Sequence, residues 1–159
     1  MNIKLCCVGK LKESFFVDAC AEYQKRLARY CTLQVYEVAD EKAPESLHPA
    51  DEARVKEKEG ARLLATLDPK DVVVALAIGG KTYTSEAFAK RLGDWEDGGT
   101  RTVAFVIGGS LGLSPAVLAR ADETLSLSAM TLPHRIARLV LLEQLFRGYK
   151  IRRNETYHK

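Results

Sequence analysis

Segments with the apolar spacing of a strand alternate along the chain with segments that have the apolar spacing of a helix. This alternation constrains the fold more than any other feature of the sequence. We expect strands over Asn2–Val8, Thr32–Val38, Asp71–Ile78, Thr102–Ile107 and Glu123–Leu127, and helices over Lys12–Tyr30, Pro49–Leu67, Thr84–Trp95 and Pro133–Ile151, with a further short helix opening at Ser114-Pro115. Parallel strands need crossover connections, which are usually helices. The order therefore predicts an α/β protein with a mostly parallel sheet covered by helices on both faces.

Two of the predicted strands are apolar throughout, over Val72–Ile78 and Val103–Ile107. Strands that lack alternation are buried on both faces, so we expect these two in the centre of the sheet. Ligands of open α/β sheets lie beyond the carboxyl ends of the strands. Three loops should therefore share one edge of the sheet, beginning at Ile78-Gly79-Gly80, Ile107-Gly108-Gly109 and Leu127-Ser128-Ala129.

Length and composition indicate one ordinary globular domain over residues 1–159, because 47% of the residues are hydrophobic and 28% are charged. No apolar run approaches the roughly 18 residues of a membrane helix. The first ten residues are charged too soon for a signal peptide, so a cytoplasmic location is expected. The four cysteines, at positions 6, 7, 20 and 31, show no CxxC spacing and are expected to be buried reduced thiols.

The net charge of +3 is too small by itself to indicate nucleic-acid binding, but its distribution is uneven. Residues 134–159 contain seven Lys or Arg residues against two Glu residues. A basic carboxyl-terminal region of this kind permits a phosphate-rich partner without requiring one.

The glycine-rich segment 108–112 (GGSLG) joins a predicted strand to a predicted helix, where many proteins bind nucleotides. It is not a Walker motif, because no lysine follows Gly112, and Ser110 interrupts the GxGxxG fingerprint. Two interpretations stay open. The glycines either form only a tight turn, or they bring main-chain groups close to an adenine ring or a ribose.

Two further segments have an ordinary and a functional interpretation. Residues 127–134 (LSAMTLPH) form either a plain connection or a second region of main-chain hydrogen bonding. The final residues Asn154–Lys159 are polar and offer little for a core to bury, so they form either a disordered terminus or a base-binding element. In the second case Tyr157 would stack on a base beside His158.

Five stretches carry a more specific pattern: ALAIGGK (75–81), FVIGGSLGLS (105–114), SLSAMTLPH (126–134), LLEQLFRGYKI (141–151) and the terminal YHK. Together with VGKLKE near the start and EKEG at 57–60, this set resembles the ribosomal RNA large subunit methyltransferase H family. That family belongs to the SPOUT superfamily of S-adenosylmethionine-dependent RNA methyltransferases. The resemblance covers essentially the whole chain.

The resemblance implies methylation of N3 of a pseudouridine in large-subunit ribosomal RNA, either in that subunit or in the assembled ribosome. It also implies a homodimer, S-adenosylmethionine as cofactor, no metal, and a carboxyl-terminal trefoil knot that wraps the methyl donor. Mainly through the backbone, the cofactor should contact Leu76, Gly108, Gly109, Leu127, Ser128, Ala129, Met130, Thr131 and Leu132.

The candidate catalytic residues lie at the two ends of the last predicted helix. His134 and Arg138, one turn apart, are candidates to surround the base at the start of this helix. Tyr157 and His158, reaching across the dimer, would orient a flipped-out base. Either His158 or bulk water would take the N3 proton. Glu143 and Arg147 also share a helix face, but their spacing equally fits a plain ion pair.

Two other classes of protein share the alternating pattern. A flavodoxin-like or receiver-like binding module would give no reason for the terminal YHK, and a receiver would need paired acids where Val8-Gly9-Lys10 stands. The other alternative is a non-catalytic ribosome-associated protein, which would not be required to bind S-adenosylmethionine.

Two helices carry expectations about packing. The first should turn Phe15, Phe16, Ala19, Tyr23 and Leu27 toward the core. The last carries apolar residues over more than one face, namely Leu139, Val140, Leu142, Leu145, Phe146 and Tyr149. We expect the excess apolar surface of that helix to pack against a second copy of the chain.

Overall fold

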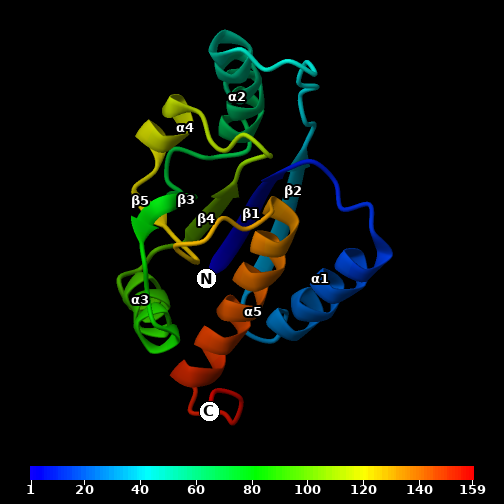
Figure 1. Ribbon diagram of the computed structural model, residues 1–159. Coiled ribbons are helices and arrows are strands. Elements are labelled where there is room, and N and C mark those ends of the chain that lie inside the picture. Colours follow the sequence, from blue (N-terminus) through cyan, green and yellow to red (C-terminus); the bar gives the residue numbers. More distant parts are fainter.

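A computed structural model describes all 159 residues, in which five strands and five helices alternate (Figure 1). The elements are β1 (Asn2–Val8), α1 (Ser14–Leu27), β2 (Thr32–Val38), α2 (Pro49–Leu64), β3 (Val72–Lys81), α3 (Ser85–Asp97), β4 (Thr102–Ile107), α4 (Pro115–Arg120), β5 (Glu123–Leu125) and α5 (His134–Arg152). None of the helices combines the length and the apolar character needed to cross a membrane.

The five strands form one sheet in the order β2-β1-β4-β3-β5, and every neighbouring pair is parallel. This confirms the predicted parallel sheet. The apolar strands β3 and β4 are both interior, as their lack of alternation predicts, and β1 is interior as well. All carboxyl ends of the strands consequently lie along the same edge of the sheet.

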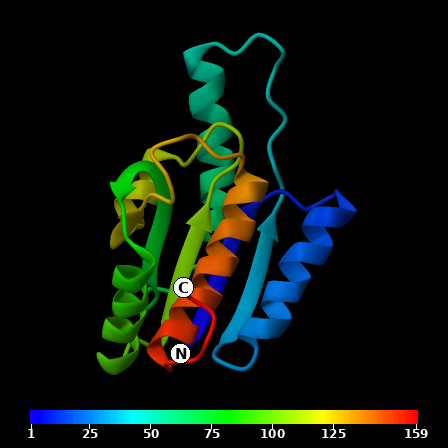
Figure 2. The same cartoon turned by 60° about the horizontal axis from the view of Figure 1, so that its bottom comes forward.

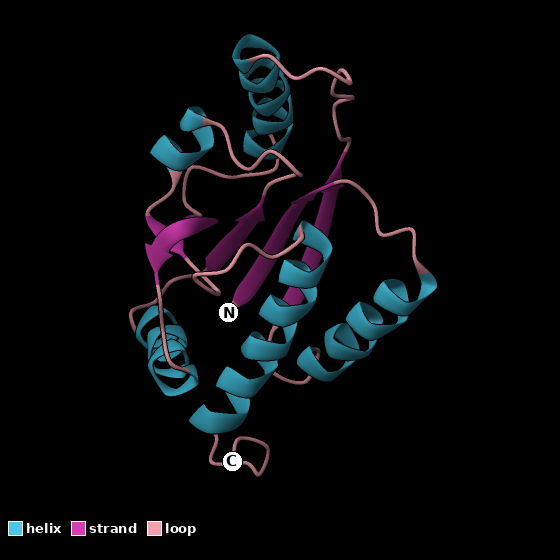
Figure 3. Cartoon of the chain, viewed as in Figure 1, coloured by secondary structure: helices cyan, strands magenta, loops and turns pink.

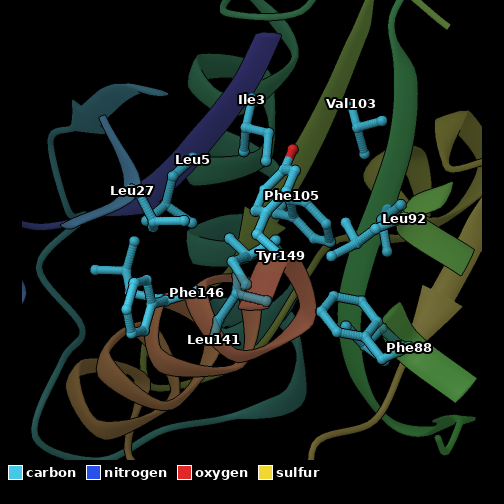
Figure 4. Packing of buried hydrophobic residues seen from close by; sticks show 14 of the residues in the cluster. Ile3, Leu5, Leu27, Phe88, Leu92, Val103, Phe105, Leu141, Phe146 and Tyr149 are labelled. Atoms are coloured by element: carbon cyan, nitrogen blue, oxygen red, sulfur yellow. The ribbon is translucent and has the colours of Figure 1, made fainter. Parts of the chain in front are cut away.

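Helices cover both faces of the sheet, as Figures 1 and 2 show. On one face, α1, α3 and α5 enclose a large core with β1 and β4, in which Leu5, Phe105 and Tyr149 are fully buried (Figure 4). On the other face, α2 and α4 pack with the opposite side chains of the same strands in a smaller cluster that includes Leu63 and Val117. The two clusters together explain why β1 and β4 are apolar on both sides.

Helix α5 lies between α1 and α3 (Figures 1 and 3), and this position explains its wide apolar surface. Tyr149 stacks on Tyr30 with ring centroids 5.6 Å apart, on the α1 side. On the α3 side, a Cβ at Gly148 would lie 2.6 Å from Cδ1 of Leu92. Leu142 and Leu145 are fully buried within the chain. Leu142, Leu145, Phe146 and Tyr149 are thus covered within one chain, whereas Leu139 and Val140 are half-buried, and packing of this helix against a second copy stays a prediction.

Helix α1 packs against the core with one narrow stripe of side chains. Phe16, Cys20, Tyr23 and Leu27 follow the i, i+4, i+7, i+11 spacing, and Leu27 is fully buried. Phe15 is 65% exposed, so its predicted inward packing is wrong. Successive side chains of a helix point about 100° apart, so only one of two adjacent phenylalanines can face the sheet.

Strand β3 continues to Lys81, so the predicted end of the strand at Gly79-Gly80 is wrong. Leu76 and Lys81 both pair with Leu125 of β5, and the residues between them bulge out of the ladder. Gly79 has a φ of +87°, and a Cβ at Gly80 would lie 2.9 Å from the backbone of Leu125. The bulge therefore needs glycine at both positions, for conformation at the first and for space at the second.

Side-chain hydroxyls cap two helices, and the cysteines are unpaired thiols, as predicted. The hydroxyls of Thr84 and Ser114 accept hydrogen bonds from the third residue along, at the starts of α3 and α4. All four cysteines are unpaired, and three of them are buried. Burial raises the pKa of the Cys7 thiol to about 12 and that of the Cys31 thiol to about 11.

A buried ion pair joins β1 to the segment that precedes β3. The Lys4 ammonium donates to Oδ2 of Asp71 at 2.8 Å and to Oδ2 of Asp68 at 2.5 Å. Burial alone would lower the pKa of Lys4, but the two carboxylates more than offset it and the net pKa is raised. The side chain of Asp71 is 4% exposed and that of Asp68 is 71% exposed.

This difference in burial predicts different losses for the two carboxylates. Asp71→Ala should lower the free energy of unfolding by about 3 kcal/mol, because a buried ammonium loses its buried partner. Asp68→Ala, the matched control, should cost less than about 1 kcal/mol, because its side chain lies in water. Urea unfolding followed by circular dichroism measures both, and equal losses would contradict the role of burial.

Candidate functional site

Strand register brings the predicted cofactor residues to one place. Ala75 pairs with Val106 of β4, and Leu76 pairs with Leu125 of β5. Leu76 therefore lies between the ends of β4 and β5. Gly108 comes two positions after Val106, and Leu127 comes two positions after Leu125. We call residues 76–80, 108–112 and 127–132 the rim.

The rim segment after β5 leaves its main chain available to a ligand. Within residues 127–132, only the N–H of Met130 has an acceptor in the chain, the hydroxyl of Ser128 at 2.9 Å. The N–H groups of Leu127, Ala129 and Thr131 make no hydrogen bond with other protein groups. Because these N–H groups are not used within the chain, they are available to a ligand that lies against this segment.

The rim segment after β4 is a tight turn. Gly112 has a φ of +88°, and Gly109 and Gly112 form an isolated antiparallel bridge. A Cβ at Gly108 would lie 2.7 Å from the carbonyl carbon of Gly112. These glycines are required by the turn itself, whether or not a ligand is present. A substitution such as Gly109→Val would consequently disrupt the turn itself, whatever its effect on a bound ligand.

Glu59 of α2 lies against this turn and was not identified as a site residue from the sequence. Its side chain is buried, and its carboxylate oxygens would lie 3.0 and 3.2 Å from a Cβ at Gly109. Oε2 accepts from the N–H of Glu41 at 3.1 Å, whereas Oε1 has no hydrogen-bond partner. The EKEG stretch was visible as part of the family pattern, but nothing in it indicated burial.

The environment of Glu59 favours the neutral carboxyl. Burial raises its pKa, and the hydrogen bond from Glu41 offsets this only in part. The charge of Asp40 acts in the same direction as burial. A proton on Glu59 therefore costs the native state less than an unpaired buried charge would.

His134 and Arg138 lie where α5 begins, at the rim, as expected. The Arg138 guanidinium is buried and donates to Oε2 of Glu37 at 2.7 Å and to the carbonyl of Gly9 at 3.1 Å. It thus ties α5 to the ends of β1 and β2. His134 is half-buried, and burial together with the charges of Arg135 and Arg138 lowers its pKa.

The tail, residues 154–159, is packed rather than free, contrary to the expectation that it offers little to bury. The Tyr157 ring meets Phe146 edge-on at 4.8 Å, and its hydroxyl donates to Glu143 at 3.1 Å. His158 lies between two helices, with Nε2 2.8 Å from Oε1 of Glu86 and Nδ1 3.2 Å from Nη1 of Arg147. Deleting the tail would therefore also remove packing contacts.

One chain does not bring all four predicted catalytic residues together. Helix α5 has 19 residues and is about 28 Å long. His134 and Arg138 lie at its rim end, whereas the tail folds back along the helix, so that Tyr157 contacts Glu143 and His158 contacts Arg147, roughly 14 to 20 Å along the helix from His134. Glu143 and Arg147 form the ion pair that their spacing permits, and each also contacts the tail, through Tyr157 and His158.

A cavity of about 240 Å³ opens beside the rim, between α3, the end of β5 and α5. Tyr83, Phe88, Leu127 and Val140 supply apolar walls, and Gln144 supplies a polar one. It shares only Leu127 with the predicted cofactor residues. The side chains of the structure include no group of three or more His, Cys, Asp or Glu placed to hold a metal ion.

The chain matches the family model described as "Predicted SPOUT methyltransferase" over residues 1–158. Relatives named "Ribosomal RNA large subunit methyltransferase H" are 55% identical in Exiguobacterium sp. (strain ATCC BAA-1283 / AT1b) and 54% identical in Ligilactobacillus salivarius. Each alignment spans 159 residues and all of both chains.

Solved structures share the fold at low sequence identity. A Bordetella pertussis protein described as a probable methyltransferase aligns with a TM-score of 0.59 at 16% identity, covering 93% of this chain and 96% of the other. A Legionella pneumophila protein assigned as a methyltransferase, solved with its cofactor SAM bound, aligns with a TM-score of 0.51 at 13% identity. That alignment covers 93% of this chain and 66% of the other.

The buried carboxyl of Glu59 predicts a pH-dependent contribution to stability. Because its pKa is raised, this contribution is full below the ordinary value near 4.5 and is lost as the pH rises through the raised pKa. Glu59→Gln has no proton to release. Its free energy of unfolding relative to the unmodified protein should therefore increase from acidic to neutral pH. Urea unfolding of both proteins measures this, and a constant difference would contradict it.

Proposed function

Because the chain belongs to the ribosomal RNA large subunit methyltransferase H family of SPOUT methyltransferases, we propose that it methylates N3 of a pseudouridine in large-subunit ribosomal RNA with S-adenosylmethionine. The observation that carries the proposal is the rim, where Leu76, Gly108 and Leu127 converge by strand register. A ribosomal substrate implies that the protein works in the cytoplasm.

The rim fits S-adenosylmethionine through its main chain. The free N–H groups of Leu127, Ala129 and Thr131 can bind the adenosyl group, while Leu76 and Gly108 border it. Residues 127–132, which include the small residue Ser128, carry no charge. Nothing in this segment therefore favours a triphosphate over an uncharged adenosyl group. When bound, S-adenosylmethionine supplies a reactive methyl group on a sulfonium.

His134 is suited to take the N3 proton of the base. N3 of pseudouridine is a weakly acidic imide, so its proton must leave as the new N–C bond forms. The lowered pKa keeps His134 neutral at neutral pH, with a ring nitrogen free to accept a proton. We assign the proton to His134 rather than to His158, because both ring nitrogens of His158 are already engaged, by Glu86 and Arg147. Alignment of base and donor supplies much of the remaining rate.

Arg138 and the tail have different parts in this proposal. Arg138 holds the start of α5 in place through Glu37 and Gly9, and so orients His134. Tyr157 and His158 come from a second copy, because roughly 14 to 20 Å of helix separates their contacts Glu143 and Arg147 from His134 of their own chain. They would then hold the base against the rim of the partner.

The homodimer that this arrangement requires has support in exposed apolar side chains. Phe15 and Val17 of α1 and Ile136 of α5 are all exposed. Glu13 and Arg135 form an ion pair of 2.6 Å that joins the same two helices. An apolar surface over α1 and α5 is typical of a contact between copies, and an antiparallel pair would place each tail at the rim of its partner.

The proposal requires S-adenosylmethionine binding and methyl transfer. Calorimetry should detect binding of S-adenosylmethionine but not of ATP or flavin mononucleotide, which a flavodoxin-like module would take. Radiolabelled methyl should enter large-subunit ribosomal RNA, and mass spectrometry of nucleosides should place it on N3 of a pseudouridine. Free RNA, large subunits and assembled ribosomes are compared as substrates. Binding without transfer to any of the three would contradict the enzymatic proposal.

If each site combines the rim of one copy with the tail of the other, two different inactive variants should complement each other in a mixed dimer. His134→Asn should be inactive because its rim lacks the proton acceptor, and a chain without residues 157–159 should be inactive because it lacks the element that holds the base. Mixing equal amounts after unfolding and refolding should restore about one quarter of the activity, since half the dimers are mixed and each has one intact site. A mixture as inactive as its components would show that tail and rim act within one chain.

A further inference from the structure

A second cavity, of about 270 Å³, lies at the end of the molecule opposite the rim. It opens between the carboxyl-terminal ends of α1 and α5 and is closed by the tail. Its walls are formed by Arg26, Arg29, Tyr30, Phe146, Lys150, Thr156 and Tyr157. None of these residues apart from Tyr157 has a part in the proposed reaction. The cavity therefore needs its own explanation.

Basic side chains dominate this cavity. We call Arg26, Arg29, Lys150 and Arg153 the basic patch. Arg26 pairs with Glu22 at 2.9 Å and Lys150 pairs with Glu155 at 2.7 Å, whereas Arg29 and Arg153 form no ion pair. Two unpaired guanidiniums thus lie side by side with two partly neutralised cations, in a protein whose whole net charge is +3.

Aromatic rings hold three of these cations in place. The Arg153 guanidinium lies over the Tyr30 ring, 4.8 Å from its centroid, and Lys150 Nζ lies 5.6 Å from the centroid of Phe146. The Tyr30 hydroxyl is fixed in turn by a 2.6 Å hydrogen bond to Glu155. Cation–π contacts of this kind restrict long side chains that would otherwise move freely. Arg26, Lys150 and Arg153 are consequently restrained before any partner binds, whereas Arg29 has no such contact.

We propose that the basic patch binds the sugar-phosphate backbone of RNA next to the target nucleotide. The inference rests on the proposed function and names a second contact for the same substrate. Guanidiniums match phosphate oxygens in bidentate geometry, and two of them here have no internal carboxylate to satisfy them. Phosphate contacts fix the position of a nucleic acid and carry no sequence information, so a patch that binds the backbone should position RNA without selecting sequence.

The place of the patch suits this task. It lies at the same end of the chain as the tail, since Thr156 and Tyr157 form part of the cavity wall. In the proposed antiparallel dimer, the patch of one copy would therefore lie beside the rim of the other. RNA whose target base enters one rim would then place a neighbouring phosphate on the patch of the partner.

The test compares two double variants that each remove two positive charges. Arg29→Gln with Arg153→Gln changes the unpaired members of the patch, and Arg54→Gln with Lys58→Gln changes α2 on the other face of the sheet. Each is titrated with a labelled RNA hairpin of the large-subunit sequence, and with an unrelated hairpin, at several salt concentrations. The patch variant should bind both RNAs at least about tenfold more weakly, and its salt slope should fall by about two. The control variant should change little.

Further measurements separate this inference from the proposed function. Calorimetry with S-adenosylmethionine, thermal unfolding and the mass from light scattering should be the same in both variants and in the unmodified protein. RNA affinity and salt slope equal to the control would overturn the inference, whatever the methyl-transfer assay shows. Weaker binding to whole large subunits with unchanged binding to RNA would point to a ribosomal protein and overturn it too. A changed mass would reassign the patch to the contact between copies.

Discussion

The burial of α5 between α1 and α3 is the constraint on which the rest of the structure depends. Leu142, Leu145 and Tyr149 of this helix fill the core above β1 and β4, so its position and direction are fixed. Its start is further held by the buried guanidinium of Arg138. This rigid helix keeps His134 at its start, while the tail packs against Glu143 and Arg147 in its second half. The proposed dimer follows from that separation.

The rim depends on backbone geometry more than on side-chain chemistry. The β3 bulge, the turn at 108–112 and the segment 127–132 follow the carboxyl ends of three parallel strands, so they are brought together by the sheet. Free N–H groups in the last segment give this edge its capacity to bind a ligand. The titratable groups lie around it, with Glu59 beneath the turn and His134 beside it.

The two ends of the molecule therefore differ in chemistry. The rim offers main-chain donors with few charges, as an adenosyl group needs. The opposite end offers guanidiniums held over aromatic rings, as a phosphate backbone needs. A methyltransferase for ribosomal RNA requires both surfaces, and an antiparallel pair of chains would bring the two together twice. This gives a physical reason for a small protein of this kind to act as a pair.

The sequence by itself determined the parallel sheet and the interior places of β3 and β4, because these follow from local periodicity. Its motifs also identified the family, and a trefoil knot is what that resemblance implies, although the rarity of knots argues against one. Only the tertiary structure decided what depends on distant neighbours. It exposed Phe15, buried Glu59 without a partner for one oxygen, and placed the tail away from the rim of its own chain. No local pattern records which surfaces of other segments will cover a side chain, so these features could not be predicted from the sequence alone.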